Sequence, residues 1–99
     1  MRERFDLPGE LTIYSVTDTC YAMRAWLARQ EAGDAEPVEV GAAGVRDIDG
    51  AGLQLLGSFT RSLSVQGLAW RFADSSPQLL EACTALGVSS WLTSTGANP

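Results

Sequence analysis

Strand-like and helix-like segments alternate along this chain, and this alternation limits its possible folds more than any other feature. Residues 11–16 are rich in β-branched and aromatic side chains and predict a strand. Val38–Gly41 and residues 68–72 predict two more strands, and residues 2–7 predict a short edge strand. Because helix-like segments separate the later strands, the order indicates crossover connections and a mostly parallel sheet.

Three segments carry apolar residues three and four positions apart, which is the period of a helix. The predicted inner faces are Cys20, Met23 and Leu27 with Trp26 beside them in the first, Leu53, Leu56, Phe59 and Leu63 in the second, and Leu79, Cys83 and Leu86 in the third. We expect these faces to pack against the sheet, so that helices cover it.

Residues that favour helix ends set the expected boundaries. The expected N-terminal caps are Thr17 or Asp18 for the first helix, Asp49 for the second, and for the third either Ser76 followed by Pro77 or Ser75 paired with Gln78. Gly33 and Gly87 are expected to end the first and third helices. Residues 88–92 are expected to add one or two helical turns, and residues 93–99 to fray.

The length of 99 residues is that of one domain. Such a chain buries about 65% of the surface that its unfolded form exposes, which leaves little material for a deep enclosed site. The sequence therefore predicts one α/β domain with a mixed, mostly parallel sheet of four to five strands and about four helices. Its core is expected at residues 11–92, followed by a tail at residues 93–99.

Acidic side chains outnumber basic ones, and the net charge is −5. An acidic chain repels phosphate groups, so nucleic acids and anionic membranes are poor partners. The alternative is that the acidity only aids solubility. Cys20 and Cys83 lie inside helix-like segments, and neither a secretory signal nor a run of about 18 apolar residues is evident. We therefore expect a reduced, cytoplasmic protein that does not insert into membranes.

The residue types that support catalysis are scarce. The chain has no histidine and no lysine, so a Ser-His-Asp arrangement is impossible. Cys20 is the better placed cysteine for a nucleophile, but its position on an apolar stripe favours packing. The sequence therefore predicts no enzymatic activity, no catalytic residue and no cofactor.

Two short motifs match ligand sites only in part. Gly50 and Gly52 begin like a dinucleotide fingerprint, but the third glycine would fall at position 55, which is Leu55. Asp47 and Asp49 have the spacing of paired carboxylates that hold Mg²⁺, yet the lysine usual at such sites is missing. A capping role for Asp49 and a solvated Asp47 are favoured, and no metal site is predicted.

The most informative segment is residues 45–56, where an aspartate and three small residues precede a leucine-rich helix. Asp49 can accept hydrogen bonds from the first free N–H groups of that helix. Gly50, Ala51 and Gly52 carry almost no side chain, so they are expected to leave the helix start open to a partner. The alternative is that the glycines only let this turn pack against the sheet.

This segment therefore predicts a surface that binds a partner protein. Its predicted members are Asp47, Asp49, Gly50, Ala51, Gly52 and Gln54. On this hypothesis, the substitution Gly52→Asp weakens partner binding and leaves the fold largely intact.

The segment resembles the central motif of STAS domains, which include the bacterial anti-sigma factor antagonists. The order of the other segments is similar too, up to the ending Leu86-Gly87-Val88, so the resemblance covers residues 11–92. It implies a STAS-like α/β domain that regulates by binding protein. The implied partner is an anti-sigma-like kinase or a chemotaxis-type signalling protein.

In the antagonists that this chain resembles, a serine or threonine accepts phosphate, and the added charge releases the partner. The matching position is Ala51, preceded by Gly50, and neither has a hydroxyl. The family's switch therefore cannot operate here, and Ser58 and Thr60, about two turns further on, do not replace it geometrically.

Two other functions remain open at this point. The resemblance also extends to accessory subunits that bind the ATPase of phospholipid-transporting ABC systems. Relatives of that kind often keep a threonine directly after the aspartate, where this chain has Gly50. A sensor that holds a small ligand at the sheet edge has no cluster of polar residues to support it.

Overall fold

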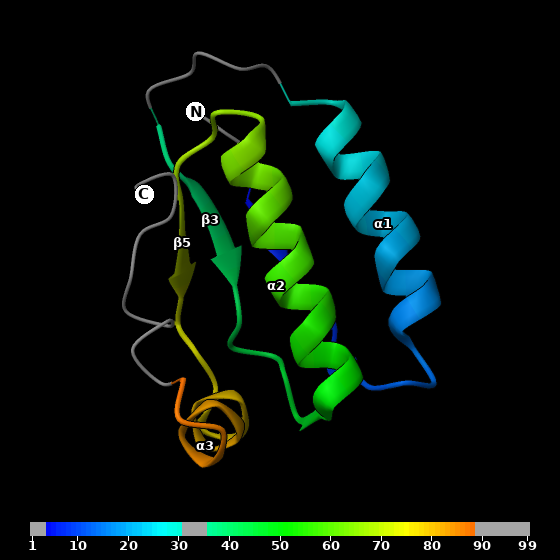
Figure 1. The fold of residues 1–99 in the computed structure, drawn as a ribbon, viewed down its shortest axis with the longest axis vertical. Helices are drawn as coiled ribbons and strands as arrows, with labels where there is room; N and C mark the ends of the chain where they lie inside the picture. Colours follow the sequence, from blue (N-terminus) through cyan, green and yellow to red (C-terminus); the bar gives the residue numbers. More distant parts are fainter. Residues whose placement is uncertain (1–3, 31–35, 89–99) are drawn as a thin grey trace.

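The computed structural model describes residues 4–30 and 36–88 of the chain (Figure 1). Its elements are, in chain order, β1 (Phe5–Asp6), β2 (Glu10–Leu11), α1 (Val16–Ala28), β3 (Val38–Gly41), β4 (Asp47–Ile48), α2 (Gly50–Val65), β5 (Trp70–Ala73) and α3 (Pro77–Ala85). The predicted α/β class is confirmed, and the strand at β3 has the predicted bounds.

The strands form two small parallel sheets. One has the order β1-β3-β5, with Phe5 opposite Val40 and Val38 opposite Trp70, and the other pairs β2 with β4. The predicted parallel pairing is confirmed. The prediction of one sheet of four to five strands is wrong, because the described residues form separate sheets of three and two strands. The described residues form three of the four predicted helices, and of the fourth, predicted at residues 88–92, only Val88 is described.

The predicted strand at residues 11–16 is mostly a turn, and this difference helps to explain the divided sheet. The Thr12 N–H donates to the Ser15 hydroxyl at 3.0 Å, and the Ser15 N–H donates to the Thr12 carbonyl at 2.9 Å. Such local bonds compete with a strand ladder, so β2 has only two residues. Ile13 and Tyr14, whose side chains favoured a strand, are 61% and 91% exposed.

The helix starts agree with the sequence where a side chain caps the helix. α1 begins before Thr17 and Asp18, so these two predicted caps lie inside its first turn. α3 begins as predicted: Pro77 is its first residue, and the Ser76 hydroxyl accepts the N–H of the third helical residue at 3.1 Å. The alternative cap at Ser75 is therefore wrong.

Gly87 ends α3, as the sequence predicts. Its φ of +73° lies in the left-handed region that favours glycine. The chain then folds back, because the Val88 N–H donates to the Cys83 carbonyl at 2.8 Å. α1 ends at Ala28 with Arg29 as its C-terminal cap, so the expected helix end at Gly33 is wrong. The predicted turns and tail at residues 89–99 lie outside the described residues.

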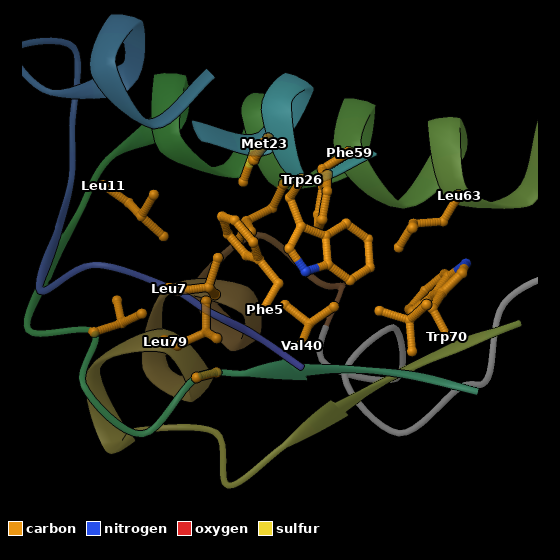
Figure 2. Close-up of a cluster of buried hydrophobic side chains, with 14 of the residues drawn as sticks. Phe5, Leu7, Leu11, Met23, Trp26, Val40, Phe59, Leu63, Trp70 and Leu79 are labelled. Atoms are coloured by element: carbon orange, nitrogen blue, oxygen red, sulfur yellow. The ribbon is translucent and has the colours of Figure 1, made fainter. Parts of the chain in front are cut away.

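The main core lies between the β1-β3-β5 sheet and the two helices α1 and α2, which cover one face of it (Figures 1 and 2). Phe5 of β1 meets Trp26 of α1 with ring centroids 5.9 Å apart, and it meets Phe59 of α2 at 5.1 Å. α3 packs against β4. Among the described residues, no helix is long and apolar enough to cross a membrane.

Most of the predicted inner faces are buried. The buried members are Met23, Leu56, Phe59, Leu63, Leu79 and Cys83. α1 is rotated by about one residue from the prediction, so that Thr19 and Trp26 are buried. Cys20 and Leu27 are therefore only half-buried, and Leu86, which follows the last turn of α3, is 62% exposed.

The opposite face of the three-stranded sheet carries charged side chains. Glu39 of β3 alternates with the buried Val40, as a strand requires, and it pairs with Arg71 of β5. The Arg4 Nε lies 2.8 Å from the Asp6 carboxylate on β1. These side chains are 34–71% exposed, so within the described residues the expected helical cover is present on one face only.

Truncation of a core leucine tests this packing. We expect Leu63→Ala on α2 to lower the free energy of unfolding by about 2–5 kcal/mol, because Leu63 is fully buried and the change leaves a cavity. Val65→Ala on the same helix removes an 81% exposed side chain and should change stability by less than about 0.5 kcal/mol. Urea unfolding measures both, and equal effects would contradict the described core.

Candidate functional site

Asp49 ties the start of α2 to the turn between β2 and α1. Its Oδ1 accepts the Gly52 N–H at 3.0 Å, which confirms the predicted cap, and its Oδ2 accepts the Ile13 N–H at 2.9 Å. The Asp49 N–H donates to the Leu11 carbonyl at 3.2 Å. Both carboxylate oxygens are thus used within the chain, and Asp49 positions the start of α2.

The same hydrogen bonds favour the charged form of Asp49. The Ile13 N–H contributes most and the Gly52 N–H next, and together they hold the pKa of the carboxyl below its ordinary value of 3.8 despite some desolvation. Asp49 is therefore ionised at neutral pH. Its charge offsets part of the positive end of the α2 dipole, so less of that dipole is open to a partner.

Gly52 packs inside the fold. It is buried, and a Cβ at this position would overlap the Leu11 carbonyl group and lie 2.9 Å from the Leu11 Cβ. The expectation that Gly52 leaves the helix start open is therefore wrong. The expectation that Gly52→Asp keeps the fold is wrong for the same reason, and the alternative of a packing glycine is correct at this position.

Gly50 and Ala51 differ from Gly52. Gly50 is exposed, and a Cβ there would meet no atom within 4 Å. Ala51 is half-buried and faces a hollow between α1 and α2. These two positions are therefore the part of the predicted segment that stays open to a partner.

The hollow, which we call the α1–α2 groove, has a volume of about 500 Å³. It runs between two helices that lie side by side in Figure 1. Its lining residues are Ile13, Val16, Thr17, Cys20, Tyr21, Arg24, Ala51, Gln54, Leu55 and Ser58. The groove thus joins part of the predicted segment to α1 and to the turn that precedes it.

The predicted site residues divide between two places. Ala51 and Gln54 line the groove. Asp47 is exposed on β4 and lines a separate hollow of about 310 Å³ between β4 and α3, together with Gln78 and Glu81. Of the six predicted residues, the structure therefore brings only Ala51 and Gln54 together in the groove.

Several residues of the groove were missed by reasoning from the sequence. Ile13 and Tyr21 are 61% and 67% exposed at its edge, and Arg24 lies on the same wall of α1. Tyr14, the neighbour of Ile13, is 91% exposed. A signal was present, because Thr17, Tyr21 and Arg24 recur at helical spacing beside the predicted apolar stripe.

The groove offers binding contacts and few reactive groups. Cys20 is half-buried there, and no described histidine, cysteine, aspartate or glutamate residues gather in a group of three that would hold a metal ion. Cys83 is buried in the core, where desolvation raises the pKa of its thiol. Ser58 is exposed in the groove, whereas the Thr60 hydroxyl is buried and donates to the Leu56 carbonyl at 3.1 Å.

Comparisons with protein-family models, curated proteins and solved structures found no match for this chain. The resemblance to STAS domains therefore stays an expectation that rests on the motif and the order of segments. What the chain does must be inferred from the groove and the residues around it.

Two alanine substitutions in one turn of α2 separate the packing glycine from the open one. We expect Gly52→Ala to destabilise the fold by about 3 kcal/mol or more, because the added methyl group meets backbone atoms. Gly50→Ala should be neutral or stabilising by up to about 1 kcal/mol, because its Cβ has free space. Thermal and urea unfolding measure both, and a well-tolerated Gly52→Ala would contradict the contact with Leu11.

The bonds of Asp49 predict a pH dependence of stability. Because its pKa is lowered by folding, the stabilisation is present above about pH 4 and is lost as the pH falls below 3.8 through the folded-state value. Asp49→Asn should therefore reduce stability at about pH 7 and flatten its fall toward about pH 3. Urea unfolding at the two pH values measures this, and parallel curves for both proteins would contradict it.

Proposed function

We propose that this chain is a non-catalytic regulatory module that docks a signalling protein at the α1–α2 groove and the exposed start of α2. The proposal follows the resemblance to STAS domains and to anti-sigma factor antagonists. Its main support is one observation: the exposed apolar side chains of Ile13 and Tyr21 line the same groove as Ala51 of the motif.

Exposed apolar side chains are the first argument for a protein partner. Ile13, Tyr14 and Tyr21 are 61–91% exposed, within or next to the groove. Large apolar side chains that gather on a surface mark contact sites, and tyrosine is enriched among residues that dominate binding. Burial of these three by a partner would contribute about 25 cal/mol for each Å² of apolar surface removed from water.

The open start of α2 is the second argument. Gly50 is exposed and Ala51 faces the groove, so a partner can approach the helix backbone closely at these positions. The Asp49 carboxylate holds this turn in place, because it accepts hydrogen bonds from the Ile13 and Gly52 N–H groups. The helix start is therefore ordered before a partner arrives, which lowers the entropy cost of binding.

The missing hydroxyl shapes the proposed mechanism. Ala51 stands where the antagonists that this chain resembles carry their phosphorylated residue, so docking does not depend on phosphate at that position. The Thr60 hydroxyl is buried and bonded within α2, which makes it a poor substitute acceptor. We propose constitutive docking of a cytoplasmic partner, controlled by the abundance of that partner.

Capture of the partner tests this function. We expect the tagged chain to bind an anti-sigma-like kinase or a chemotaxis-type signalling protein, and Ala51→Arg to weaken that complex by about tenfold or more, because the long side chain fills the groove. Ala22→Arg is the matched control, since Ala22 lines a different hollow on α1 and should change the affinity by less than about twofold.

Identification by mass spectrometry and titration calorimetry supply the measurements. Recovery of the ATPase of an ABC system would instead support the accessory-subunit function. Equal affinities of Ala51→Arg and the unaltered chain would contradict docking at the groove.

A further inference from the structure

The charges of this protein are distributed unevenly around the α1–α2 groove. The chain has 12 acidic residues and 7 arginines, yet none of the described residues that line the groove is acidic. α2 contains no acidic residue at all. The one acid of α1, Asp18, lines a different hollow with Phe5 and Ala22.

One arginine lines the groove, and a second lies further along the same face of α2. Arg24 lines the groove from α1. Arg61 on α2 follows Gln54 and Ser58 at helical spacings of seven and three, so it shares the face that they present to the groove. Neither arginine has an ion pair with a described residue, whereas Arg71 on the outer face of the sheet pairs with Glu39.

The groove therefore has an apolar end and a positive end. Both helices run in the same direction in Figure 1, so their first turns lie at one end of the groove. Ile13 precedes α1, Tyr21 is the sixth of the 13 residues of α1, and Leu55 is the sixth of the 16 residues of α2. Arg24 and Arg61 come later along each helix.

The helices also set the size of an occupant. α1 lines the groove from Val16 to Arg24 and α2 lines it from Ala51 to Ser58, so the walls are about 14 and 12 Å long at 1.5 Å per residue. A partner helix of two to three turns covers that length, and it carries apolar side chains along one stripe with charges beside it. Two parallel helices with a groove between them are a suitable seat for a third helix.

We infer that the α1–α2 groove selects an acidic amphipathic helix of the partner, with its apolar stripe on Ile13, Tyr21 and Leu55 and its carboxylates facing Arg24 and Arg61. This inference rests on the proposed docking function and adds the chemistry of the partner. The net charge of −5 favours basic partners at long range. A groove that has Arg24 in its lining, Arg61 further along α2 and no acid among its described lining residues reverses that preference locally.

Two synthetic helical peptides of about 18 residues test the inference. They share one leucine stripe, and one carries glutamates and the other lysines on the flanking positions. We expect the glutamate peptide to bind at least about tenfold more tightly in NMR titrations of the full chain, and Arg24→Glu to remove that preference. Arg29→Glu makes the same charge change at the C-terminal cap of α1, outside the groove lining, and should retain the preference.

Cysteine reactivity locates the peptide independently. Cys20 lines the groove and Cys83 is buried in the core. The glutamate peptide should slow alkylation of Cys20, while Cys83 should stay unreactive until the chain is unfolded. Circular dichroism checks that each variant keeps the helical signal of the unaltered chain.

The outcomes separate this inference from the proposed function. Equal or tighter binding of the lysine peptide, unprotected Cys20, or occupation of the groove by a second copy or by anionic vesicles would overturn the acidic helix. Loss of the natural complex in Ala51→Arg would still support docking in that case. Conversely, a tight glutamate peptide that protects Cys20 supports the acidic helix even where capture yields no signalling protein.

Discussion

The two hydrogen bonds accepted by the Asp49 carboxylate join parts of the chain that are 36 residues apart. One bond caps α2 through the Gly52 N–H, and the other holds the Ile13 N–H in the turn before α1. Gly52 lets this arrangement close, because a side chain there would meet the Leu11 backbone. The relative position of α1 and α2, and so the shape of the groove, depends on this contact.

The motif at residues 49–52 has two roles, one in packing and one in the proposed binding. Asp49 and Gly52 face inward and hold the α2 start against β2 and the following turn. Gly50 and Ala51, between them in the sequence, face outward or into the groove. Helical geometry separates these roles, since successive residues lie about 100° apart around the axis. Substitutions in the motif should therefore affect stability at some positions and binding at others.

Features set by neighbouring residues could be predicted from the sequence. The caps at Asp49 and Ser76, the end at Gly87 and the bounds of β3 depend on side chains within a few positions of each boundary. The turn at residues 11–16 could not, because its β-branched residues favour a strand while the Ser15 hydroxyl and the distant Asp49 carboxylate hold it as a turn. The groove was missed because α1 and α2 come together only in the folded chain.

The placement of charges distinguishes the groove from the outer face of the sheet. On the outer face of the sheet, Arg71 forms an ion pair with Glu39. The charges of these two side chains are therefore already paired within the chain. Arg24 in the groove and Arg61 further along α2 have no ion pair with a described residue, and exposed apolar side chains lie near Arg24. A carboxylate of a partner could pair with these arginines without first breaking an existing ion pair. The groove therefore offers both burial of apolar surface and selectivity for negative charge. The same protein can thus be acidic overall and still prefer an acidic segment at one site.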